Sequence, residues 1–162
     1  MGGSSDFHID PGPSFADSIV ALRKAAYGRH DKKGIEQLDA AIEAMLESLF
    51  NWPHVAGLRE ESFPPKTAAK VDGWTLHKLE FSCPRVNGAQ RQGRLMILVN
   101  LNERLIRPIY IYTHAQFPGR VPDGSLKDLI HAAARSSPKI PIAELAATSE
   151  PASSAAKVPD DK

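Results

Sequence analysis

Hydrophobic residues recur at helical spacing over two early segments of the chain. After Ser14, a residue type favoured at helix N-termini, the apolar positions fall three or four residues apart at Phe15, Ile19, Leu22 and Ala26. From Ile35 to Phe50 the same spacing returns, with acidic residues on the opposite face. We therefore predict two amphipathic helices, separated by a turn.

Three later segments have the apolar character of β-strands. They are Trp74–Phe81, Arg94–Leu101 and Leu105–Thr113. The turn at Asn100–Glu103 is too short for anything but an antiparallel hairpin. The run Leu95–Val99 is apolar on both faces, which predicts a strand at the centre of a covered sheet.

Shorter patterns complete the expected order βααβββα. Asp6–Asp10 predicts a short first strand, and Ser125–Arg135 predicts a closing helix. Pro108 within the last strand predicts a bulge or a missing hydrogen bond in the ladder. The expected fold class is α+β, with two N-terminal helices packed on a small, mostly antiparallel sheet and an extra C-terminal helix.

Composition supports one globular domain in the middle of the chain. The sequence has 162 residues, 42% of them hydrophobic, which is enough for a core. We assign residues 6–135 to the domain. Residues 1–5 and 136–162 are small, polar or rich in Pro, Ala and Ser, and we expect both segments to be disordered.

Several classes of protein are disfavoured by what the sequence lacks. No run approaches the roughly 20 apolar residues of a membrane span, and no secretory signal pattern is visible, so we expect a cytoplasmic protein. Cys83 is the only cysteine, and the six histidines show no ligand spacing. We expect neither a metal site nor a cofactor.

Charge is unevenly distributed along the chain. The net charge is +1, yet residues 74–114 hold six Lys and Arg against two Glu. Basic residues bind phosphates, and this segment also carries aromatic rings that stack on unpaired bases. The segment therefore indicates RNA binding, with an ordinary solvated sheet face as the alternative.

Strand alternation gathers candidate catalytic groups. In a regular last strand Tyr110, Tyr112 and His114 share one face, and Arg94 joins them if the hairpin register brings it alongside. RNA cleavage needs a base, an acid and a cation for the phosphate. Glu80 or His114, Tyr112 and Arg94 are the candidates for these roles. The alternative is that the tyrosine rings belong to the core and that His114 is an ordinary hydrogen-bonded histidine.

The pattern resembles the RelE/ParE superfamily of bacterial type II toxins. The likeness begins with Phe7–Ile9 followed by Pro13–Ile19, similar to the family's first strand and helix. Gly93–Val99 resembles the central strand, which an arginine opens. Ile109–His114, followed by Ser125–Ile130, resembles the closing strand and the extra helix of longer members.

This resemblance implies a toxin of a toxin-antitoxin system, silenced by a cognate antitoxin. The RelE-like branch is an mRNA interferase, a metal-independent endoribonuclease that cuts mRNA on the ribosome and so inhibits translation. The family roles fall on Arg94 for phosphate and on Tyr112 or His114 for proton transfer. The candidate RNA-binding residues are Lys78, Arg85, Arg91 and Tyr110.

Two other functions remain open at the level of sequence. The ParE-like branch inhibits DNA gyrase without being an enzyme. A non-toxic protein-binding module with a RelE-like fold is the third possibility, in which a groove or sheet edge receives a partner's helix or strand. Enzymatic activity is therefore a hypothesis that the sequence does not decide.

Overall fold

The computed structural model describes residues 7–67 and 71–136 and has the predicted α+β fold. The helices are α1 (Phe15–Tyr27), α2 (Lys32–Ser48) and α3 (Asp123–Arg135). The strands are β1 (His8–Ile9), β2 (Leu58–Glu61), β3 (Trp74–Ser82), β4 (Gln92–Asn100) and β5 (Leu105–Thr113). Short 3₁₀ helices are η1 (Leu49–Asn51) and η3 (Gly88–Gln90). The tails that we expect to be disordered lie outside the described residues, apart from Ser136.

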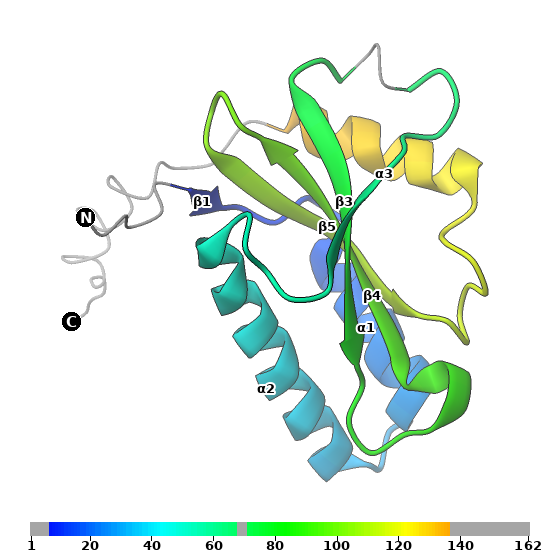
Figure 1. Ribbon diagram of the computed structural model, residues 1–162. Helices are drawn as coiled ribbons and strands as arrows, with labels where there is room; N and C mark the ends of the chain where they lie inside the picture. Colours follow the sequence, from blue (N-terminus) through cyan, green and yellow to red (C-terminus); the bar gives the residue numbers. More distant parts are fainter. Residues whose placement is uncertain (1–6, 68–70, 137–162) are drawn as a thin grey trace, which may run out of the picture.

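The strands form one five-stranded sheet in the order β1-β5-β4-β3-β2 (Figure 1). β2, β3, β4 and β5 are a continuous antiparallel meander, and β1 pairs with β5 in parallel. The parallel pair is possible because α1 and the following elements separate β1 from β5 along the chain. The predicted mostly antiparallel sheet is thereby confirmed.

Helices cover both faces of this sheet (Figure 1). α1 and α2 pack on one face and form a first core with β-strand residues such as Leu95 and Ile111. α3 packs on the other face and forms a second core through Leu126 and Ile130, against Met96 and other residues of the sheet. Because side chains alternate along a strand, neighbouring residues of β4 enter opposite cores.

The central strand is buried on both faces, as its apolar run predicts. Each residue from 95 to 99 is at most 1% exposed. A strand in this position cannot carry solvent-exposed groups along its middle. Polar chemistry on β4 is therefore confined to its ends, and Arg94 lies at the first of them.

Two elements differ from the sequence-based prediction. β2 was not predicted, because Leu-Arg-Glu-Glu has no apolar alternation; this edge strand forms by pairing with β3 alone. α2 begins at Lys32 and not at Ile35. The side chain of Asp31 accepts a hydrogen bond from the amide of Gly34 at 2.9 Å, so an N-cap starts the helix inside the segment read as a turn.

The predicted irregularity at Pro108 is a β-bulge. Met96 pairs with Tyr110 while Ile97 pairs with Pro108, which leaves Ile109 as the extra residue of β5. Strict alternation would place Ile109 in the first core with Ile111. The bulge instead places it in the second core.

The buried side chain of Ser18 links α1 to β5 of the sheet by a hydrogen bond. Its hydroxyl donates to the carbonyl oxygen of Phe15 at 2.7 Å and accepts the amide hydrogen of Ile111 at 3.0 Å. We expect Ser18→Ala to lower the free energy of unfolding by about 1–3 kcal/mol, because the buried amide of Ile111 would lose its acceptor. Urea unfolding followed by circular dichroism measures this loss.

Ser14→Ala is the matched control. Ser14 occupies the N-cap position of α1, as predicted, but its side chain makes no capping hydrogen bond. Its replacement should therefore cost much less than that of Ser18. Equal losses in the two variants would contradict the anchoring role of Ser18.

Candidate functional site

Neighbouring strands bring Glu80, Arg94 and Tyr112 into one row across the sheet. Arg94 of β4 lies opposite Glu80 of β3 on one side and opposite Tyr112 of β5 on the other. Directly opposed residues point to the same face of a sheet. Arg94 and Tyr112 therefore share a face, because the hairpin register brings them alongside as the prediction required, and it is the face that carries α3.

The rows on either side extend this arrangement. Ser82 pairs with Gln92, and the amide of His114, just after β5, donates to the carbonyl oxygen of Gln92 at 2.9 Å. Alternation places His114 on the same face as Tyr112. On the other side of the central row lie Lys78, Met96 and Tyr110.

Opposite charges on this face lie close together. Nε of Arg94 is 3.9 Å from Oε2 of Glu80, and Nζ of Lys78 is 3.8 Å from the same oxygen and 3.5 Å from Oε2 of Glu61. These distances exceed those of ordinary N–H···O hydrogen bonds. Arg94 also donates to the carbonyl oxygen of Gly93 at 3.2 Å. The cations are thus balanced by charge but loosely held.

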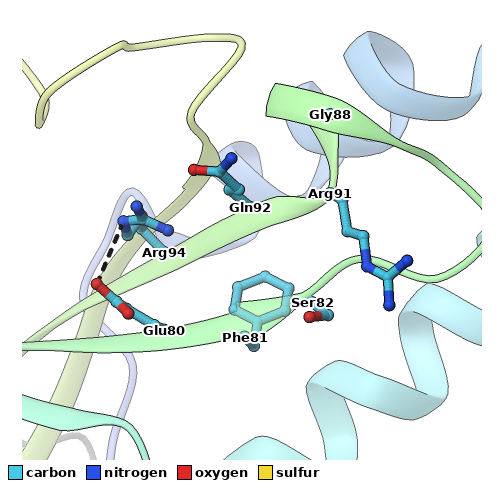
Figure 2. A pocket seen from close by; sticks show the side chains of 7 residues that line it. All are labelled: Glu80, Phe81, Ser82, Gly88, Arg91, Gln92 and Arg94. Atoms are coloured by element: carbon cyan, nitrogen blue, oxygen red, sulfur yellow. Dashed lines mark ion pairs between the residues drawn. The ribbon is translucent and has the colours of Figure 1, made fainter.

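A shallow cavity of about 530 Å³ opens at this end of β3 and β4. It is lined by Glu80, Phe81, Ser82, Gly88, Arg91, Gln92 and Arg94. Figure 2 shows the side chains of Glu80 and Arg94 facing each other, with the guanidinium of Arg91 directed away from them. The cavity therefore has one paired and one separate cationic group.

Tyr112 is buried, in contrast to the solvent-open position that proton transfer would need. Its exposed fraction is 0%, and among the described residues its hydroxyl donates to Sδ of Met96 alone, at 3.9 Å. The ring of Phe117 packs against it with centroids 5.6 Å apart. Burial raises the pKa of Tyr112 to about 12, so the phenol keeps its proton at neutral pH.

The remaining predicted RNA-binding residues are only partly brought together. Tyr110 lies half-buried on the face of Tyr112, with the two ring centroids 6.3 Å apart. Arg91 lines the cavity. Arg85 lies elsewhere, with its Nε 3.9 Å from Oδ1 of Asp31 at the start of α2.

The basic residues of segment 74–114 do not form one exposed patch. Arg107 is 0% exposed and bonds to backbone carbonyls and to Asp10, as described below. Arg104 is exposed and stacks over the ring of Phe7, 5.4 Å from its centroid. The exposed cations Arg85, Arg91 and Arg104 are dispersed, while the partly buried Lys78 and Arg94 lie together and are paired with Glu61 and Glu80.

Residues outside the predicted set complete the face. Arg120 follows β5 in the chain, yet its Nη1 is 3.6 Å from Oε1 of Glu61 and donates to the carbonyl oxygen of Ser62 at 2.8 Å. Its Nη2 lies 3.1 Å from Oδ1 of Asp123. The sequence offered no signal for these contacts, because β2 itself was not predicted.

Two further observations concern the described part of the chain. Among residues 7–67 and 71–136 no cluster of three or more His, Cys, Asp or Glu side chains is placed to hold a metal ion. In the same ranges no helix has the length and apolar character needed to cross a bilayer.

Comparison with protein-family models, with curated proteins and with solved structures finds no match for this chain.

Proposed function

We propose that this protein is a metal-independent endoribonuclease, acting as the toxin of a type II toxin-antitoxin system. The observation that carries the proposal is the cross-strand row of Glu80, Arg94 and Tyr112, with His114 in the turn directly after β5. A carboxylate, a cation and a phenol are the kinds of group that RNA cleavage needs. The resemblance to the RelE/ParE superfamily supports the same assignment.

The reaction assigned to this row is an internal displacement at one phosphodiester. The 2′-oxygen of the ribose attacks phosphorus while its proton passes to the carboxylate of Glu80. The bond to the 5′-oxygen breaks, which leaves a 2′,3′-cyclic phosphate on one product. Arg94 balances the negative charge that accumulates on the phosphoryl oxygens, because its guanidinium is only loosely paired in the absence of RNA.

The departing 5′-oxygen needs a proton from a neutral acid. Tyr112 lies directly opposite Arg94, and burial raises its pKa from 10 to about 12, so its phenol is protonated at neutral pH as an ordinary tyrosine would be. We assign the acid role to Tyr112 on the condition that its buried hydroxyl is uncovered when RNA binds, with the partly buried His114 as the alternative after the end of the same strand. Lys78, Arg91 and Tyr110 are the proposed contacts for neighbouring phosphates and bases.

The proposed setting follows from the substrate. mRNA on the ribosome places the protein in the cytoplasm, and a toxin of this kind requires a cognate antitoxin protein as its partner. The loosely paired charges around Lys78 and Arg94 are a surface on which a second polyanion, such as an acidic protein segment, would compete with RNA.

Pulsed expression in bacteria tests the proposal. The protein should stop growth within the pulse, and mapping of transcript ends should show new cleavage sites inside translated reading frames. The physical reason is that a ribosome-associated nuclease reaches only the mRNA that is being translated.

The same experiment separates the other two functions. Intact transcripts together with a DNA-damage response would indicate gyrase inhibition and contradict the nuclease assignment. Unhindered growth, with the protein present in the soluble fraction, would favour a binding module without toxicity.

A further inference from the structure

A connecting segment crosses the face that carries the candidate site. Residues 114–122 link β5 to α3, and we call them the strap (Figure 1). Arg120 of the strap contacts residues at the end of β2. Since β4 and β3 lie between β5 and β2 in the sheet, the strap passes over both strands on the α3 side.

Hydrogen bonds and a ring contact fix the first half of the strap. The amides of Gln116 and Phe117 donate to the carbonyl oxygen of Thr113 at 3.0 and 3.1 Å. The side-chain oxygen of Gln116 accepts the amide hydrogen of Thr113 at 3.0 Å. The turn directs Phe117 onto the sheet, where its ring packs against Tyr110 and Tyr112.

Arg120 and its neighbour Val121 hold the second half, and Val121 is buried in the second core. Arg120 donates to the carbonyl oxygen of Ser62 at 2.8 Å and to Oδ1 of Asp123 at 3.1 Å, and it pairs with Glu61 at 3.6 Å. Between the two fixed points, Pro118 and Gly119 are exposed. Ion pairs near the surface contribute little and weaken with salt. The ion pairs of Arg120 are therefore the part of this attachment that can be exchanged while Val121 stays in the core.

The strap covers a phenol with an unusually poor partner. A buried tyrosine hydroxyl normally bonds to nitrogen, oxygen or water. Within residues 7–67 and 71–136, the one hydrogen-bond acceptor of the Tyr112 hydroxyl is the thioether of Met96, a weak acceptor, at 3.9 Å. Arg94 lies opposite Tyr112 in the register and Phe117 of the strap packs on its ring, so Tyr112 lies between the site and the strap.

We propose that the strap is a gate over Tyr112, held closed by Arg120 and opened when Arg120 leaves Glu61 and Ser62. Opening lifts Phe117 from the tyrosine rings and exposes the hydroxyl beside Arg94. The use of the exposed Tyr112 hydroxyl as an acid rests on the proposed function, because it requires an RNA substrate. Closure of the gate itself is independent of any activity.

An anionic substrate would open the gate by competing for Arg120. A phosphate chain that approaches Lys78 and Arg94 offers Arg120 an alternative partner to Glu61. The carboxylate of Glu61 keeps Lys78 as its counter-ion, at 3.5 Å. The free energy of exchanging one ion pair for another is small at a surface that remains partly hydrated.

Nitration of tyrosine by tetranitromethane, resolved by mass spectrometry, tests the gate in the full-length protein. Fragment ions distinguish Tyr110 from Tyr112. In the wild type we expect Tyr112 to react much more slowly than half-buried Tyr110. In Arg120→Ala its rate should rise about ten-fold, the effect of losing a charge-assisted hydrogen bond. Arg59→Ala, at an exposed arginine of β2, should leave it unchanged.

A second variant keeps the test decisive if Arg120→Ala perturbs folding. Phe117→Ala removes the cover directly and should also expose Tyr112, and urea unfolding checks that each variant is folded. High salt should speed nitration in the wild type and have little effect in Arg120→Ala. An unchanged rate in both folded variants, or equal rates for Tyr110 and Tyr112 in the wild type, would overturn the gate.

RNA cleavage by the same proteins separates this inference from the proposed function. Faster nitration of Tyr112 without any cleavage of RNA would establish the gate and refute the nuclease assignment. Cleavage by the wild type, with nitration of Tyr112 unaffected by Arg120→Ala, would support the nuclease and overturn the gate.

Discussion

Replacing Arg107 with methionine is expected to lower the free energy of unfolding by about 3–5 kcal/mol, the range found when one partner of a buried charge network is removed. The guanidinium is 0% exposed. It donates to the carbonyl oxygen of Asp10 at 3.1 Å, to Oδ2 of Asp10 at 2.7 Å and to the carbonyl oxygens of Ala133 and Ser136. It also lies over the ring of Trp74, 5.5 Å from the centroid.

The size of this effect reflects what Arg107 joins. Asp10 belongs to the segment between β1 and α1, Ala133 to the last turn of α3, and Arg107 itself to β5. The carbonyls at the end of a helix have no partner within the helix, so a buried cation there satisfies them and opposes the helix dipole. Methionine fills part of the volume but leaves several acceptors without donors.

Urea unfolding of Arg107→Met and Arg104→Met makes the comparison. Arg104 is exposed and contributes a cation–π contact with Phe7, so its loss should cost about 0.5–1 kcal/mol. A loss below about 1 kcal/mol for Arg107→Met would show that the network contributes far less than its burial indicates. Asp10→Asn should fall between the two, because the backbone acceptor of Asp10 remains.

Arg94→Ala is expected to lower the rate of RNA cleavage about 10²- to 10³-fold, the effect of removing one preorganised group that stabilises transition-state charge. Arg94 lies between Glu80 and Tyr112 in the register, so no other described cation has the same position between a base and an acid. The measurement is cleavage of a translated mRNA by purified protein, with growth arrest on expression as a second readout.

Arg91→Ala is the matched control for this prediction. Arg91 lines the same cavity, but its side chain points away from Glu80 and Arg94 (Figure 2). Its loss should weaken binding of RNA with little effect on the chemical step. Equal effects of the two substitutions would contradict the central role of Arg94, and cleavage at the wild-type rate by Arg94→Ala would remove the mechanism.

The sequence predicted the fold well because most of the pattern is local. The spacing of Phe15, Ile19 and Leu22 needs only one helix to be read, and the apolar run at Leu95–Val99 needs only one strand. The bulge at Pro108 follows from a single missing amide hydrogen. β2 escaped prediction because it forms through pairing with β3 and not through its own composition.

Part of the cross-strand row at the candidate site was predicted from the sequence, but the residues that cover it were not. Alternation grouped Tyr112 with Tyr110, and hairpin geometry made a pairing with Arg94 possible, which the register shows. The position of Glu80 opposite Arg94 was not predicted. The burial of Tyr112 could not be predicted from strand alternation. Phe117 and Arg120 lie in a connection without periodicity, so their position over the sheet had no signature in the sequence.

Arg107 shows the same division most clearly. In the sequence it is one more cation in a basic segment, while in the structure it is sealed between β5, the chain before α1 and the end of α3. By itself the sequence determined the fold class, the antiparallel hairpin of the last two strands and the shared face of Tyr110 and Tyr112, because side-chain direction repeats with a fixed period along each element. Only the tertiary structure decided which charges meet solvent and which are covered, because burial depends on elements that are distant in the chain and brought together by packing.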